Sequence, residues 1–142
     1  QIANGELDVL VNARGNKGYY ESTKTNIIEK YDSELELVRM KMLDNDINVI
    51  HWTKKHGIYI PYTYNGIIKN YVPDFLITHL DGTVSLEETK GYDPKSKLKK
   101  EALRNYCNEN GFICSWIPQH GTSEKTVLLM KEYRKYRISK LK

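Results

Sequence analysis

The sequence YVPDFLITHLDGTVSLEETKG, residues 71–91, decides the fold. Two runs rich in apolar and β-branched residues flank Leu80-Asp81-Gly82, which is a turn signal because it contains glycine. This pattern predicts a β-hairpin with strands over residues 71–79 and 83–90. A Pro-Asp pair lies within the first strand and Glu-Glu-Thr-Lys ends the second, so the open end of the hairpin is expected to be charged.

A three-residue loop fixes which residues face each other across this hairpin. If His79 pairs with Thr83, the same register sets Asp74 opposite Glu88. Directly opposed side chains on an antiparallel pair point to one face, with Cβ atoms about 5 Å apart. Alternation along the strand brings Lys90 to that face as well. The sequence therefore predicts that two carboxylates and one ammonium group converge at the strand ends.

The opposite face of the hairpin is expected to carry Phe75, Ile77 and Thr89. A one-residue bulge would exchange Glu87 for Glu88 on the charged face. We assign Glu88 to that face because, of these two acids, it alone stands two residues before the lysine.

Two facing carboxylates repel each other unless solvent, a lysine or a divalent cation neutralises them. Mg²⁺ binds through one or two carboxylates and takes waters and substrate phosphate oxygens as its other ligands. A lysine beside such a metal can orient and help to deprotonate an attacking water. Metal, water and ammonium group together provide what the hydrolysis of a phosphodiester requires. An ordinary hairpin with a charged, solvated end is the alternative.

The flanking sequence predicts helices on both sides of the hairpin. Ser33 and Glu36 form a capping-box pattern at the start of a helix that ends at Asn45-Asp46. A second helix begins at Asp93-Pro94 and ends at Asn110-Gly111. The sequence also predicts a helix that starts within 21–30 and a basic helix over 123–140. Further strands are predicted over 47–52, 57–64 and 112–117, with a turn at Asn65-Gly66. Pro61 places the strand over 57–64 at the edge of a sheet.

The order of elements from residue 33 is therefore α-β-β-β-α-β, with a mixed central sheet, a βαβ crossover and flanking helices. The chain has 142 residues and a globular composition, which fits a single domain. It contains no apolar run of about 18 residues, the length that a membrane helix needs, and no signal-peptide pattern opens it. Cys107 and Cys114 lack the spacing of a disulfide framework or a zinc site and are expected to be free thiols.

Pro73-Asp74 followed by Glu88-Thr89-Lys90 resembles the PD-(D/E)xK nuclease superfamily, as does the order of elements over residues 33–117. Tyr71-Val-Pro-Asp-Phe-Leu76 and Glu88-Thr-Lys-Gly91 are similar to small phage junction-resolving endonucleases and to the transposon-end-cleaving nuclease subunit. The resemblance implies a restriction-endonuclease-like αβββαβ core and a Mg²⁺-dependent endodeoxyribonuclease, with Mn²⁺ as a substitute metal. It implies that Asp74 and Glu88 bind the metal together with the Thr89 carbonyl, and that Lys90 assists the nucleophilic water.

The resemblance also places an acid on the helix before the hairpin, commonly within a Ser-x-x-Glu pattern. Ser33-Glu34-Leu35-Glu36 fits this pattern and makes Glu36 the candidate catalytic acid. Glu34 and Glu29 are the alternatives. The capping-box role of Glu36 competes with the catalytic one.

Basic residues crowd the segment after the hairpin and the end of the chain. The net charge of +4 permits an anionic partner, and the clusters suit contacts with a phosphate backbone. DNA is the expected partner, without a membrane, in the cytoplasm of a bacterial or phage-infected cell. Because one site cuts one strand, double-strand cleavage calls for a homodimer or a partner subunit. The residues expected to bind DNA are Lys95, Lys97, Lys99, Lys100 and Arg104.

We expect one nuclease domain over residues 1–142, with a poorly matched extension over 1–30, a catalytic core over 33–117 and the basic helix over 123–140. Two other functions are compatible with the sequence. One is a nuclease fold kept for DNA binding or recruitment without catalysis. The other is a protein-interaction domain that engages a protein partner through its 11 tyrosines and its carboxyl-terminal helix. RNA is an alternative substrate.

Overall fold

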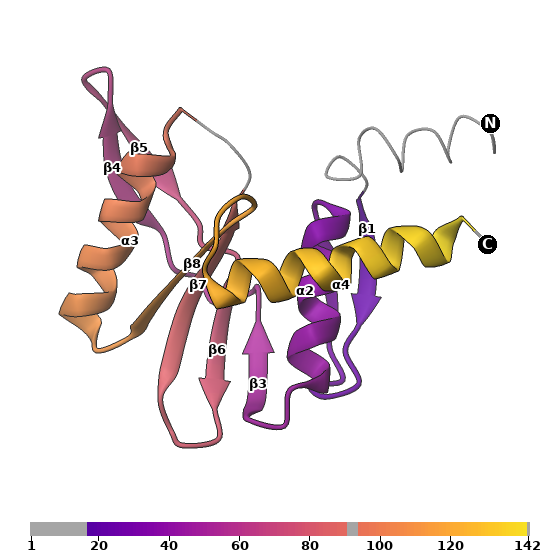
Figure 1. The fold of residues 1–142 in the computed structure, drawn as a ribbon. Coiled ribbons are helices and arrows are strands. Elements are labelled where there is room, and N and C mark those ends of the chain that lie inside the picture. The colour runs from indigo at the N-terminus through magenta and orange to yellow at the C-terminus, as the bar shows by residue number, and fades with distance from the viewer. Residues whose placement is uncertain (1–16, 91–93, 142) are drawn as a thin grey trace. The chain divides into compact units, whose positions relative to one another are not determined.

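The computed structural model describes residues 17–90 and 94–141 of the chain (Figure 1). The described residues form a mixed α/β fold with three helices and eight strands. They belong to two compact units, one built from residues 17–46 and 121–141 and the other within residues 47–120. Most of the expected amino-terminal extension, residues 1–16, lies outside the described residues.

The first unit consists of a short hairpin and two helices. β1 (Gly18–Glu21) pairs antiparallel with β2 (Ile28–Tyr31), and α2 (Glu34–Asn45) packs against α4 (Glu124–Lys140) (Figure 1). Both helices begin where the sequence predicts. The reason is that the hydroxyl oxygens of the two preceding serines accept backbone N–H groups of the first turn, each at 3.2 Å.

The helix predicted to start within residues 21–30 is wrong, because this segment forms the turn and second strand of the β1–β2 hairpin. The turn is held by Asp44, near the end of α2. The Asp44 carboxylate accepts hydrogen bonds from Tyr20 Oη and Ser22 Oγ at 2.6 Å each, and from Thr23 N at 3.0 Å. A contact between segments more than 20 residues apart overrides local helix propensity here.

A four-stranded sheet with the strand order β3-β6-β7-β8 forms the centre of the second unit. Its strands are β3 (Val49–Thr53), β6 (Phe75–His79), β7 (Val84–Lys90) and β8 (Ile113–Pro118). β6 pairs antiparallel with both β3 and β7, whereas β8 is parallel to β7 because α3 (Ser96–Asn110) connects the two. The predicted mixed sheet and crossover are confirmed.

The predicted strand over 57–64 and the predicted Asn65-Gly66 turn belong to a second hairpin, whose second strand was not predicted and takes Tyr71 from the strand predicted over 71–79. β4 (Ile60–Tyr64) and β5 (Ile67–Tyr71) pair with each other in a separate two-stranded sheet. Asn65-Gly66 makes the turn with φ values of 52° and 75°, the left-handed conformation that this dipeptide favours in two-residue hairpins. Pro73 ends the run because it cannot donate to a ladder, so β6 starts only at Phe75.

The other boundaries differ little from those predicted. β4 has a single neighbouring strand, which confirms the edge position predicted from Pro61. α3 begins at Ser96 rather than at Pro94, and Asp93 lies outside the described residues. Gly111 ends α3 with a φ of 73°, as the sequence predicts.

Apolar contacts join α3 and the β4–β5 hairpin to one face of the sheet. They centre on a cluster in which no residue exposes more than 5% of its surface: Ile60, Tyr71, Leu86, Leu103 and Cys107. Phe75 lies on the opposite face and packs edge-on against Trp52, with ring centroids 5.8 Å apart. The open end of β6–β7 is therefore held by packing on both faces of the sheet.

Both cysteines are free thiols, as expected. Burial raises the pKa of the Cys107 thiol to about 12, and the neighbouring Cys114 adds to the shift. None of the helices within the described residues is long and apolar enough to cross a membrane.

Candidate active site

β6 and β7 pair in the register that the sequence predicts. Phe75 pairs with Glu87 at the open end, and the ladder continues toward the turn without a shift. One step further out, the same register sets Asp74 opposite Glu88. The bulge that would bring Glu87 to the Asp74 face is absent from this ladder. Glu87 lies buried on the other face, where Ser115 Oγ donates to its Oε1 atom at 3.0 Å.

The turn of this hairpin has the predicted three-residue loop. His79 N donates to Thr83 O at 2.8 Å, and Gly82 N donates to His79 O at 3.0 Å. Gly82 has a φ of 89°, which explains the glycine at this position. Asp81 Oδ1 accepts from Thr83 Oγ1 at 2.6 Å and from Thr83 N at 2.9 Å, and these bonds lower the pKa of Asp81.

Asp74 closes the open end of the hairpin with its side chain. Its Oδ2 atom accepts a hydrogen bond from Thr89 N at 2.8 Å. This bond holds the Asp74 carboxylate against the end of β7, beside Glu88. A carboxylate that accepts one N–H group can also bind a cation, because its two oxygens offer about four acceptor sites.

Glu88 is buried, with 4% of its surface exposed, and Asp74 is half-buried. Tyr71, the last residue of β5, lies within electrostatic range of both. Burial raises the pKa of the Tyr71 phenol far above its usual range, and the negative charges of Glu88 and Asp74 raise it further. The phenol is therefore neutral. Tyr71 is not among the site residues that the sequence predicts, although it opens the Tyr-x-Pro-Asp sequence.

His56 supports the backbone next to Asp74. Its Nε2 atom lies 2.8 Å from Pro73 O, and its Nδ1 atom accepts from Ile58 N at 3.0 Å. Because a carbonyl oxygen only accepts, this pattern assigns the ring proton to Nε2. The sequence offered no signal for this support, since His56 stands 17 residues before Pro73 and belongs to no motif.

Lys90 is the last residue of β7. Its backbone is in register with Pro118 of β8, and that of the buried Thr89 is in register with Ile117. The backbone of Glu88-Thr89-Lys90 thus follows a regular strand. The position of the Lys90 side chain stays a prediction from strand alternation.

Glu36, the predicted upstream acid, belongs to the first unit and acts as a capping residue there. Its Oε1 atom accepts from Asp32 N at 3.0 Å, while Ser33 Oγ accepts from Glu36 N at 3.2 Å. This confirms the capping role of both residues. The glutamate accepts from the backbone N–H of Asp32, the residue before the N-cap, and not from that of the N-cap itself. The catalytic role of Glu36 stays a prediction.

The alternative upstream acids are buried in the same unit. Glu34 Oε2 accepts hydrogen bonds from Tyr136 Oη and Lys140 Nζ, each at 2.9 Å. The bond to Glu34 raises the pKa of Lys140, as expected for an ammonium group beside a carboxylate. These contacts tie α2 to α4. Glu29 lies in β2, in register with Tyr20.

Three of the residues expected to bind DNA form an exposed stripe on α3. Lys97, Lys100 and Arg104 follow one another at intervals of three and four residues, so they share one side of the helix. Exposed charges at this spacing suit sequence-independent contacts with phosphates.

The other two, Lys95 and Lys99, are half-buried over tyrosine rings of the β4–β5 hairpin. Lys95 Nζ lies 5.2 Å from the ring centroid of Tyr64. Lys99 Nζ lies 5.9 Å and 5.8 Å from the centroids of Tyr62 and Tyr71. At these distances the ring faces attract the ammonium groups and restrict their positions.

The donors at the open end of β6–β7 fit a hard divalent cation. Asp74 and Glu88 supply carboxylates, and Thr89 supplies a backbone carbonyl, all of them oxygen ligands. Mg²⁺ suits two protein carboxylates because it keeps several waters. Clusters of three or more His, Cys, Asp or Glu side chains placed to hold a metal ion do not occur within residues 17–90 and 94–141.

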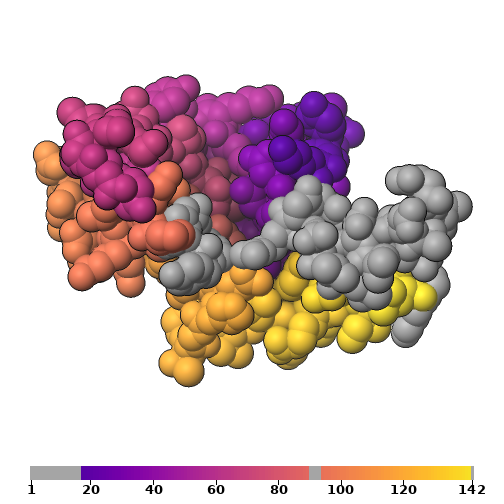
Figure 2. Space-filling view, turned by 90° about the horizontal axis from the view of Figure 1, so that it is seen from above, coloured from indigo at the N-terminus to yellow at the C-terminus, as the bar shows by residue number. Residues whose placement is uncertain are grey.

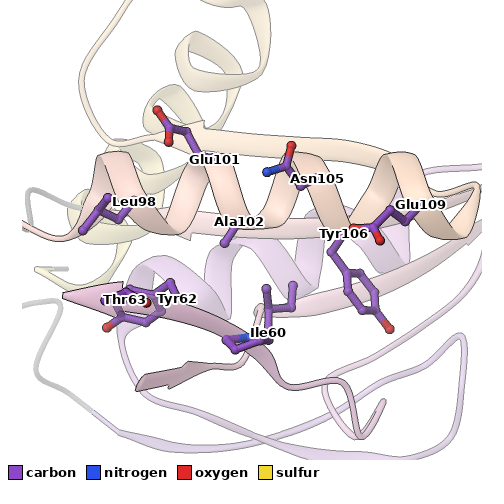
Figure 3. A pocket seen from close by; sticks show the side chains of 10 residues that line it. Ile60, Tyr62, Thr63, Leu98, Glu101, Ala102, Asn105, Tyr106 and Glu109 are labelled. Atoms are coloured by element: carbon purple, nitrogen blue, oxygen red, sulfur yellow. The ribbon is translucent and has the colours of Figure 1, made fainter. Parts of the chain in front are cut away.

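A groove of about 390 Å³ lies between α3 and β4 (Figure 3). Apolar side chains share its lining with Glu101, Asn105 and Glu109. None of the predicted site residues lines it. Its two carboxylates make it unsuited to a phosphate group.

No protein-family model matches the chain, and no curated protein sequence matches it significantly. The functional assignment therefore depends on the residues at the end of β6–β7 and on their geometry.

Proposed function

We propose that this chain is a Mg²⁺-dependent DNA endonuclease with a site of the PD-(D/E)xK kind. The observation that carries the proposal is the pairing at the open end of β6–β7. The Asp74 carboxylate bonds to Thr89 N at 2.8 Å beside the buried Glu88. Sequence register predicts that the two carboxylates are neighbours, and an ordinary solvated hairpin end has no reason to bury one of them.

The topology gives further support to a restriction-endonuclease-like core. Along the chain, α2, β3, β6, β7, α3 and β8 follow the order αβββαβ when the β4–β5 hairpin is counted as an insertion. The strand order β3-β6-β7-β8, with only the last pair parallel, agrees with the expected mixed sheet.

In the proposed site, Asp74, Glu88 and the Thr89 carbonyl hold the metal. A bound Mg²⁺ ion supplies a Lewis acid that lowers the pKa of water and neutralises charge on the scissile phosphate. Lys90 orients the attacking water, and the neutral Tyr71 phenol lies within electrostatic range of the Glu88 carboxylate. Glu36 is the candidate for a further acid.

The proposed substrate is DNA bound through its phosphates. The exposed stripe on α3 and the lysines held by tyrosines supply contacts without base readout, so the affinity should fall with salt. One such site cuts one strand, and a two-fold dimer or a partner subunit would supply the second cut.

The test is cleavage of supercoiled plasmid and of a four-way junction in Mg²⁺, in Mn²⁺ and in EDTA. Asp74→Asn and Lys90→Ala should each lower the rate by at least about 100-fold, because even changes beyond the metal ligands cost 10–100-fold. Asp81→Asn removes the same charge at the opposite end of the hairpin and should cut normally.

Calorimetric titration with Mg²⁺ separates the two leading functions. Metal binding that Asp74→Asn abolishes, together with metal-dependent cleavage, would support the nuclease. DNA binding without metal binding or cleavage would identify a nuclease fold that only binds DNA and would contradict the proposal.

A further inference from the structure

The β4–β5 hairpin has an exposed apolar tip. Ile67 and Ile68 directly follow the Asn65-Gly66 turn and expose 60% and 74% of their surface. As neighbours in a strand they point to opposite faces, so the tip is apolar on both sides. The turn itself depends on the positive φ of Asn65 and Gly66 and not on the isoleucines.

The surroundings of this tip are positively charged. Residues 58–72 contain no Asp or Glu and one lysine, Lys69. Lys95 lies over Tyr64, the residue just before the turn. The first turn of α3 also lacks acidic residues, so the helix dipole adds to the positive potential there. The charge around the tip therefore complements a phosphate backbone.

A row of tyrosine and lysine side chains connects the tip with the candidate active site. Tyr64 and Tyr62 share one face of β4, and Lys99 Nζ lies within 6 Å of the ring centroids of both Tyr62 and Tyr71. Tyr71 in turn lies within electrostatic range of the two site carboxylates. The hairpin and α3 lie side by side (Figures 1 and 2). Tyr71 itself is buried, so a nucleic-acid strand that runs from the tip to the site would pass over Lys95 and Lys99.

The groove between α3 and β4 limits this path. Glu101 and Glu109 line it (Figure 3), and their charges repel phosphates. Tyr62 also lines this groove, so the tyrosine row and the two carboxylates share one side of the hairpin, and a phosphate backbone can approach there only over Lys95 and Lys99.

We propose that the β4–β5 tip is a wedge that inserts Ile67 and Ile68 into duplex DNA at an unstacked step such as a branch point. Apolar side chains placed between base steps unstack and kink a duplex, and a step that is already unstacked costs less to open. Lys95 and Lys99 bind the phosphates next to it. This inference rests on the proposed function, which supplies DNA as the substrate. It adds a preference for branched DNA over an intact duplex.

The experiment measures fluorescence anisotropy of a labelled four-way junction and of an intact duplex of the same sequence, without Mg²⁺. The Ile67→Thr/Ile68→Thr variant keeps β-branched side chains in the strand and removes the apolar tip. The control is Ile47→Thr, an isoleucine of the same unit that exposes 86% of its surface. Circular dichroism establishes that both variants fold.

The expected result is a wild-type preference for the junction of about ten-fold or more, reduced in the double variant to about three-fold or less, because the wedge acts only at the unstacked step. Duplex affinity should change by less than about two-fold, since phosphate contacts are untouched. The control should keep the full preference.

Other outcomes overturn one proposal or both. An unchanged preference, or equal weakening on both DNAs, refutes the wedge and leaves the nuclease standing. A wild-type protein that prefers the junction but cuts no DNA refutes the nuclease, and loss of the preference in the double variant would still support the wedge. A wild-type protein that binds neither DNA refutes both. A change in oligomeric mass by light scattering, with DNA binding unaffected, assigns the tip to contacts between copies and refutes the wedge.

Discussion

The two hairpins of the second unit share a backbone design and differ in their neighbours. β6–β7 lies between β3 and β8, packs on both faces and ends in Asp74 and Glu88. β4–β5 has no third strand beside it and ends in Ile67 and Ile68, both exposed. Its base is anchored to the core through Ile60 and Tyr71, and its turn is in solvent.

This difference shows what each kind of hairpin can do. Metal ligands must be held to within about 0.5 Å, which requires side chains fixed by surrounding packing. The hairpin between two strands therefore suits the proposed metal site better than the hairpin with an exposed tip. A hairpin tip in solvent can unfold locally at a small cost in free energy. It can therefore adjust its conformation to a partner of irregular shape.

The largest expected effect is on the packing of β6. Phe75→Ala should lower the free energy of unfolding by about 3–5 kcal/mol, because it leaves a cavity beside the Trp52 ring. Ile68→Ala at the other hairpin should change it by less than about 0.5 kcal/mol. Urea denaturation followed by tryptophan fluorescence measures both. Similar losses for the two variants would contradict the comparison.

Two substitutions of Asp74 separate its structural role from its proposed role in metal binding. Asp74→Asn keeps an oxygen that can accept from Thr89 N, whereas Asp74→Ala leaves that N–H without its acceptor. We expect the alanine variant to be less stable than the asparagine variant by about 1–2 kcal/mol. Both should lose Mg²⁺ binding by calorimetry. Equal stability would show that the hydrogen bond does not hold the end of β7.

The two turns test whether the hairpins unfold together. Gly82 and Gly66 both have positive φ, 89° and 75°, and a methyl group added at either position would meet open space. Alanine therefore costs only the backbone strain, about 1–2 kcal/mol at either turn. In Gly82→Ala this strain should lower the free energy of global unfolding. In Gly66→Ala it should appear mainly as faster hydrogen exchange near the tip. Equal global losses would show that β4–β5 unfolds only with the sheet.

The smallest expected effect concerns two lysines of one helix. Lys99→Met should cost about 0.5–1 kcal/mol of stability, because the ammonium group lies over tyrosine rings. Lys97→Met, at an exposed position, should cost nothing measurable. Each substitution should also reduce the slope of log K for DNA binding against log salt concentration by about one, because one phosphate contact is lost. A loss of stability in Lys97→Met alone would contradict this distinction.

Local chemistry explains why several features could be predicted. Asn65-Gly66 and Gly82 specify turns through positive φ, and Ser33 and Ser123 specify helix starts through their hydroxyl groups. The register of β6–β7 follows from the length of its loop, so the proximity of Asp74 to the end of β7 was also predictable. In each case the residues involved are close in the chain.

Features that depend on distant contacts were not predictable. Asp44 makes residues 22–25 a turn instead of a helix, and His56 supports Pro73 across 17 residues. Tyr71 opens the Tyr-x-Pro-Asp sequence, yet its place beside Glu88 and Lys99 arises only when β5, β7 and α3 pack together.

The sequence by itself determined the starts of α2 and α4, the turns at Asn65-Gly66 and Gly82, the β6–β7 register and the pair of acids at its end, because capping, loop length and backbone geometry act locally. Only the tertiary structure decided that Glu88 is buried, that two lysines lie over tyrosines and that β4–β5 stands apart with an exposed tip. These features depend on which surfaces exclude water from one another, and that depends on the packing of segments far apart in the chain.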